Sequence, residues 1–182
     1  MSGIGHNRGP SMEPGKTWRT HCWTAARTAL LPTLPIEVVR NRVKRAAELG
    51  LDYRTYASVR AQTGHDVVAF LFSSNALRVT AQRPAMPEAK AAKLANVAAS
   101  RRGLAVAPLT ADLMTAGNPV LDGAWPAPWA LDSFPVIRDR IRAALQGQPA
   151  DRVILVGDHG LEAEWCAAGR LAAWLPAERY FG

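Results

Sequence analysis

Three short apolar segments constrain the fold of this chain more than any other feature. Residues 66–72, 104–107 and 152–156 each have the composition of a strand that is buried on both faces. Apolar runs without alternation are typical of parallel strands covered by helices, and the stretches between these runs have the apolar spacing of helices. The sequence therefore predicts an α/β fold, with a small three-layer domain around a short, mostly parallel sheet.

The first of these segments also allows a different interpretation. Val67–Phe72 contains six apolar residues, and this length and pattern also fit a short buried helix. Its β-branched and aromatic content favours a strand. Thr63–Asp66, however, could cap a helix, and residues 17–78 would then form an all-helical unit, with one strand fewer in the sheet.

A basic helical segment is expected over residues 17–64, between a flexible leader at residues 1–16 and an α/β domain at residues 65–182. The leader has too little apolar surface to offset the entropy of ordering it. Each of three expected helices begins after a side chain that can cap it, and two of them end at a glycine. The caps are Thr17, Thr33 and Asp52, and the glycines are Gly50 and Gly64.

The α/β domain is expected to contain three further helices and one long loop. The helices run from Glu88 to about Arg102, from about Ser133 to Leu145 and from Leu161 to about Leu175. Gly103 is expected to break the first of them. Residues 108–132 are rich in proline and glycine, which favours a packed or binding loop. Its tryptophans, Trp125 and Trp129, are candidates for partner contacts, which would make the protein an interaction scaffold.

The chain carries a formal net charge of +7, and most of that charge lies in its first third. Residues 1–60 have ten Lys and Arg against four Asp and Glu, a net charge of +6. This asymmetry favours a polyanionic partner, most often nucleic acid. The candidate contacts combine cations for phosphate with a ring for stacking. They are Arg40, Arg42, Lys44, Arg45, Tyr53, Arg54 and Arg60. The alternative is a solvated basic face, or a surface for an acidic protein.

The string Gly3-Ile4-Gly5-His6-Asn7 resembles a short leader found on assorted alphaproteobacterial and phage-associated proteins with otherwise unrelated bodies. The resemblance implies a bacterial or mobile-element origin and says nothing about activity. No segment approaches the roughly 18 apolar residues of a membrane helix, and the two cysteines lack zinc-type spacing. We therefore expect a cytoplasmic protein that makes no membrane contact.

Polar residues follow the first and third predicted strands, at Ser73-Ser74-Asn75 and at Gly157-Asp158-His159-Gly160. Open parallel sheets bind ligands beyond the carboxyl ends of their strands. The enzymatic alternative is therefore a small hydrolase or transferase with its site in these two loops. Its candidate catalytic residues are Ser74, Asn75, Asp158 and His159. The structural alternative is turn formation, with Asp158 capping the last helix.

The string Val156-Gly157-Asp158-His159-Gly160 resembles the metal-binding Asp-His-Gly element of the alkaline phosphatase and sulfatase superfamily. The resemblance implies metal ligation by Asp158 and His159. It covers five residues, and no companion nucleophile or metal-binding set accompanies it, so we expect no metal. Neither the P-loop nor the Gly-x-Gly-x-x-Gly fingerprint follows any predicted strand, and we expect no cofactor.

Overall fold

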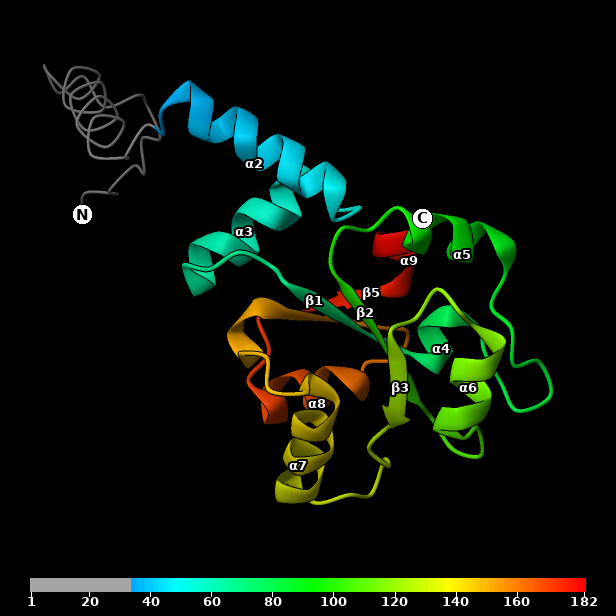
Figure 1. Cartoon of the computed structure of the whole chain (residues 1–182). Helices are drawn as coiled ribbons and strands as arrows, with labels where there is room; N and C mark the ends of the chain where they lie inside the picture. Colours follow the sequence, from blue (N-terminus) through cyan, green and yellow to red (C-terminus); the bar gives the residue numbers. More distant parts are fainter. Residues whose placement is uncertain (1–33) are drawn as a thin grey trace, which may run out of the picture. The chain divides into compact units, whose positions relative to one another are not determined.

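The computed structural model describes residues 34–182. The expected leader and the expected helix from Thr17 to Leu30 lie outside this range. The chain divides into two compact units, residues 1–39 and 40–182. Within the second unit, an all-parallel sheet of five strands is covered by helices, which confirms the predicted α/β fold (Figure 1).

The strands lie in the order β3-β2-β1-β4-β5. They are β1 (Ala69–Ser73), β2 (Ser100–Ala105), β3 (Gly123–Pro126), β4 (Val153–Gly157) and β5 (Ala173–Pro176). From β1 the chain builds outward through β2 to β3, and then it returns to the other side of β1 to form β4 and β5. The direction of winding therefore reverses between β1 and β4, where Phe72 lies opposite Val156. Such a switch point opens a crevice at the carboxyl ends of the two strands.

Helices cover both faces of the sheet. The described helices are α2 (Ile36–Glu48), α3 (Tyr53–Thr63), α4 (Ser74–Leu77), α5 (Glu88–Ala95), α6 (Ala111–Gly117), α7 (Phe134–Leu145), α8 (Glu162–Gly169) and α9 (Ala177–Phe181). Figure 1 shows α7 and α8 on one side of the sheet and α5 and α9 on the other. A single turn of 3-10 helix, Ala150–Arg152, leads into β4.

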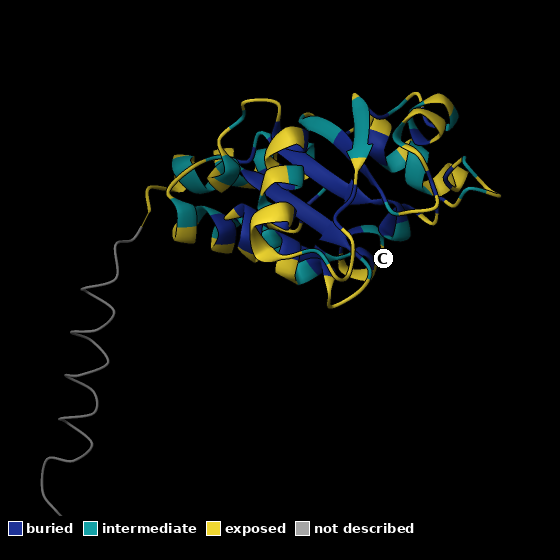
Figure 2. Ribbon diagram, turned by 90° about the horizontal axis from the view of Figure 1, so that it is seen from below, coloured by how far each residue is buried: buried dark blue, intermediate teal, exposed yellow. Residues whose placement is uncertain are grey.

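Alternate side chains of the central strand enter two different cores. Phe70 and Phe72 pack with residues of α2, α3, α5, α6 and α9, whereas Leu71 packs with α7 and α8. All five residues of β1 are buried, and Figure 2 shows the inner strands as the most buried part of the molecule. Burial on both faces explains why Val67–Phe72 shows no alternation in the sequence. Its interpretation as a strand is confirmed.

The cap predicted at Asp52 and the two terminal glycines match the structure, whereas the caps predicted at Thr17 and Thr33 lie outside the described residues. The Asp52 carboxylate accepts a hydrogen bond from the backbone N–H of Thr55 at the start of α3. Gly64 ends α3 with a φ of 74°, and Gly50 follows α2 with a φ of 66°. Both glycines adopt the left-handed conformation, which other residues adopt at a cost.

Three sequence-based boundaries were wrong. The helix expected from Glu88 to Arg102 ends at Ala95, because β2 already begins at Ser100. Gly103 is therefore part of a strand and breaks no helix. A Cβ added there would lie 2.7 Å from Cε of Met114, so this glycine lets α6 pack closely on β2.

The other two wrong boundaries hid the edge strands of the sheet. The loop expected at residues 108–132 contains α6 and the edge strand β3. The helix expected from Leu161 to Leu175 ends at Gly169, and β5 and α9 follow it. Arg170 ends α8 with a φ of 53°, and this left-handed turn directs the chain back into the sheet.

Candidate functional site

The loops after β1 and β4 meet at the switch point, as the sequence predicted. Ser73 is the last residue of β1 and Gly157 the last residue of β4. The side chain that joins the two loops is Glu162, the first residue of α8. Glu162 is only 2% exposed.

The Glu162 carboxylate accepts hydrogen bonds from both loops. Oε2 accepts from Oγ of Ser73 at 2.9 Å, from the backbone N–H of Asp158 at 2.7 Å and from that of His159 at 3.5 Å. Oε1 accepts from Nδ2 of Asn75 at 2.9 Å. Glu162 therefore fixes the end of β1 against the turn that follows β4. Its position in the first turn of α8 also places the negative charge at the positive end of the helix dipole.

Gly157 makes this arrangement possible. A Cβ at this position would lie 2.4 Å from Oε2 of Glu162 and 2.7 Å from Nε1 of Trp174. Any larger residue would displace the carboxylate from the turn. The glycine that the sequence suggested as a turn residue is thus needed for the close approach of Glu162 to β4.

A cavity of about 280 Å³ lies next to this carboxylate. Its polar lining consists of Asn75, His159 and Glu162. The rest of the lining is apolar and includes two indole rings, from Trp129 and Trp165. Trp129 is 59% exposed and Trp165 is buried. The cavity therefore has one hydrogen-bonding end and aromatic walls.

The structure brings two of the four candidate catalytic residues, Asn75 and His159, to this cavity. Ser74 is not among its lining residues. The Ser74 hydroxyl is buried and accepts a hydrogen bond from the backbone N–H of Val106, directly after β2. The Asp158 carboxylate forms an ion pair with Nη1 of Arg78 at 2.8 Å. Asn75 and His159 are therefore the two candidates that a ligand in the cavity can contact.

Two parts of the sequence interpretation need correction here. Asp158 does not cap the last helix, since the residue preceding α8 is Leu161 and makes no side-chain cap. The hydrogen bond runs the other way, from the Asp158 backbone to Glu162. Glu162 itself was missed, although an acidic residue soon after a strand and a glycine turn is a signal that could have identified it.

Metal ligation implied by the Asp-His-Gly string finds little support in the geometry. Nε2 of His159 lies 4.0 Å from Oδ2 of Asp158, and that carboxylate already pairs with Arg78. Within residues 34–182, no three His, Cys, Asp or Glu side chains form a group that could hold a metal ion.

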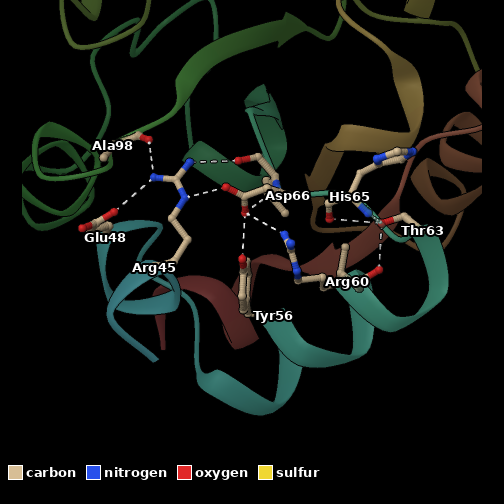
Figure 3. Close-up of polar contacts among 10 residues, drawn as sticks. Arg45, Glu48, Tyr56, Arg60, Thr63, His65, Asp66 and Ala98 are labelled. Atoms are coloured by element: carbon tan, nitrogen blue, oxygen red, sulfur yellow. Dashed lines mark hydrogen bonds and ion pairs between the residues drawn. The ribbon is translucent and has the colours of Figure 1, made fainter. Parts of the chain in front are cut away.

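The candidate nucleic-acid residues fall into two sets. Arg45 and Arg60 belong to a cluster around Asp66 (Figure 3). Nε of Arg45 donates to Oδ2 of Asp66 at 2.9 Å, and Nη1 of Arg60 lies 4.0 Å from Oδ1. The Tyr56 hydroxyl donates to the same carboxylate at 2.8 Å. Burial alone would raise the pKa of Asp66, but the hydrogen bonds from Tyr56 and Arg45 outweigh it and lower this pKa.

The second set lies on the surface of α2 and α3. Lys44, Tyr53 and Arg54 are exposed, and Arg42 is half-buried. No hydrogen bond or ion pair to another residue of the range 34–182 holds the side chains of Arg42, Lys44 and Arg54. Arg40 is also exposed. Arg42, Lys44 and Arg54 are available for contacts with phosphate, whereas Arg45 stabilises the fold.

The two loop tryptophans have different environments. Trp125 lies in β3, where it is half-buried and faces the guanidinium of Arg102, 5.9 Å from the ring centroid. Trp129 lines the cavity and is mostly exposed. Trp129 is therefore the one of the pair that is open to a ligand or partner.

Comparison of the chain with family models, with curated proteins and with solved structures finds no match in any of the three. In residues 34–182, no helix has the length and apolar character needed to cross a membrane. The geometry of the site is therefore the basis on which a function is inferred.

Proposed function

We propose that this protein binds a small, largely apolar ligand in the cavity beside Glu162. The observation that carries this proposal is the position of the cavity, at the carboxyl ends of parallel strands where the winding of the sheet reverses. This is the usual ligand position in open α/β sheets. Aromatic walls with a few convergent polar groups are also typical of small-molecule sites.

The geometry supports binding better than hydrolysis or group transfer. An acyl- or phosphoryl-transfer enzyme of the predicted kind needs a nucleophile that reaches the ligand. The hydroxyl of Ser73 donates to Glu162, and the hydroxyl of Ser74 accepts from the Val106 backbone. Both hydroxyls hold the loops together, and both residues are buried. The polar groups left for a ligand, those of Asn75 and His159, are suited to hydrogen bonding.

Filling the cavity tests this proposal. Ala130 lines the cavity and is exposed, so Ala130→Trp should occupy the space without disturbing a core. Ligand-observed NMR with a set of one-ring aromatic compounds should show saturation transfer to the wild-type chain and its loss in Ala130→Trp. Ala116→Trp, at an exposed position of α6, is the matched control and should keep the signal. Equal binding by both variants would place the ligand site elsewhere.

A second candidate function is association with nucleic acid through the surface cations of α2 and α3. The observation in its favour is that Arg42, Lys44 and Arg54 make no ion pair with the residues described. Replacing all three by Ala should reduce the slope of log affinity against log salt by about 0.9 for each phosphate contact removed from duplex DNA.

The control for this experiment is a variant with the same charge change at Arg83, Arg142 and Arg170, all of which are exposed. It should bind DNA and RNA with the wild-type salt dependence. If the two triple variants lose affinity equally, the α2–α3 surface is not the contact. Arg45 is unsuitable for this test, since its removal would also disturb the Asp66 cluster.

A further inference from the structure

We infer that the ligand of this cavity has a protonated amine at its polar end. This inference rests on the proposed function, because it names the chemistry that the same cavity selects. The observation behind it is the Glu162 carboxylate, which is almost fully buried, lines the cavity and forms no ion pair within residues 34–182. Buried carboxylates in proteins are usually paired with a cation.

The hydrogen bonds of Glu162 and Asn75, both of which line the cavity, leave acceptor capacity at its polar end. Each carboxylate oxygen has two lone pairs. Oε2 has three donors, whereas Oε1 has a single donor, the Asn75 amide. The carbonyl oxygen of that amide accepts no hydrogen bond from the residues described. Two acceptors, Oε1 of Glu162 and Oδ1 of Asn75, are therefore free for the donors of an ammonium group.

The charge at this end of the cavity is negative. All donors to Glu162 are neutral groups, and the N-terminus of α8 supplies about half of one positive charge. No lysine or arginine lines the cavity, and Arg78 pairs with Asp158. The negative charge of Glu162 is therefore only partly offset beside apolar walls, where electrostatic attraction is stronger than in water.

The walls favour the same ligand class. Indole rings are the best aromatic partners for ammonium groups, and the cavity presents those of Trp129 and Trp165. A volume of about 280 Å³ suits a compound with one ring and a short side chain. The ligand class that follows is a small arylalkylamine. A carboxylate of the same size would meet the charge of Glu162 with no cation to balance it.

Three probes that share one ring and differ in their polar end test this inference. Isothermal titration of the full chain at pH 7 would compare 2-phenylethylamine, 2-phenylethanol and 3-phenylpropionate. We expect the amine to bind at least tenfold more tightly than the alcohol, and the carboxylate to give no measurable binding. Binding of the alcohol or the carboxylate as tight as that of the amine would overturn the inference and leave the cavity as a ligand site. Binding of none of the three would overturn the proposed function as well.

A charged substitution at the cavity distinguishes an electrostatic preference for the amine from a preference based on the shape of the ligand. His159 lines the cavity and its side chain is mostly exposed, so substitutions there spare the core. His159→Gln is the uncharged reference, because both substitutions remove the imidazole and only His159→Lys adds a charge. His159→Lys should bind the amine three- to tenfold more weakly than His159→Gln does, and the two variants should bind the alcohol within twofold of each other. Equal amine affinities in the two variants would contradict the role of charge.

Glu162→Gln removes the charge itself and should abolish the preference for the amine over the alcohol. Its folding is checked by thermal denaturation, since Glu162 also joins the two loops. If the folded variant keeps a tenfold preference, the inference is wrong. If the variant does not fold, the His159 pair decides.

Discussion

Asp66 connects three parts of the fold through one carboxylate. It accepts hydrogen bonds from Arg45 in α2 and from Tyr56 in α3, and it lies three residues before β1. Arg45 extends the connection by donating to the backbone carbonyls of Val67 and Ala98. These contacts fix α2 and α3 to the amino ends of β1 and β2. The cavity lies at the opposite, carboxyl ends of the strands.

Asp66→Asn should therefore destabilise the protein. The substitution removes the charge partner of Arg45 and weakens the acceptor for the Tyr56 hydroxyl. Because Asp66 is partly exposed, we expect a loss of about 1–2 kcal/mol in the free energy of unfolding. Urea denaturation measures it. Asp151→Asn, at an exposed residue 3.5 Å from His65, is the control and should change stability by less than about 0.5 kcal/mol.

The same carboxyl predicts the direction of a pH effect. Its pKa is lowered in the folded state, chiefly by the hydrogen bonds from Tyr56 and Arg45 that outweigh burial. A carboxyl of this kind stabilises the fold fully above its unfolded pKa of about 3.9, and the stabilisation is lost as the pH falls through the lower folded pKa. The stability difference between wild type and Asp66→Asn should therefore shrink between about pH 5 and pH 2. A constant difference over this range would show that the charge of Asp66 does not contribute.

At the scale of elements, the junction of β4 with α8 depends on a glycine, Gly157, which has no side chain. Gly157→Ala would place a Cβ 2.4 Å from Oε2 of Glu162, so the carboxylate must move and its hydrogen bonds to Ser73 and Asp158 must lengthen. We expect a loss of about 1–3 kcal/mol in unfolding free energy, measured by thermal or urea denaturation.

Gly160→Ala is the matched control for this substitution. Gly160 lies in the same turn, and a Cβ added there would meet no atom within 4 Å. Its stability should stay within about 0.5 kcal/mol of wild type. If Gly157→Ala were as stable as Gly160→Ala, Glu162 would not be held by the close contact described.

The way in which each element is buried explains whether the sequence could predict it. β1 and β4 were predictable because central strands covered on both faces are continuous apolar runs. The helices α2 and α7 were predictable from their apolar stripes, and α3 from its Asp52 cap and terminal Gly64. The edge strands β3 and β5 were missed because each has four residues and ends in proline, a pattern that also fits a loop.

The site was predictable to a similar extent. The two loops followed from the strands and their polar ends, and Asn75 and His159 do line one cavity. Glu162 was not predicted, because its role depends on the distance that Gly157 allows between α8 and β4. The separation of Ser74 from the cavity also depended on three-dimensional packing, since only the fold shows that its hydroxyl meets the Val106 backbone.

At the scale of the whole molecule, the two ends of the sheet have different roles. The amino ends of the strands are joined to the basic helices by the Asp66 cluster, and the carboxyl ends surround the cavity. The strand order places the cavity where the winding reverses. A ligand bound there would contact residues from the segments that follow β1, β2, β3 and β4, and it should therefore stabilise the whole α/β unit by mass action.

The most direct test of the proposed ligand site is a two-dimensional NMR titration of the labelled full chain with 2-phenylethylamine. We expect the largest shifts at the Asn75 side-chain amide, the His159 backbone amide and the indole N–H groups of Trp129 and Trp165. We expect little change in α2 and α3. Shifts concentrated away from these four residues, or none at saturating probe, would contradict the assignment of the cavity as the ligand site.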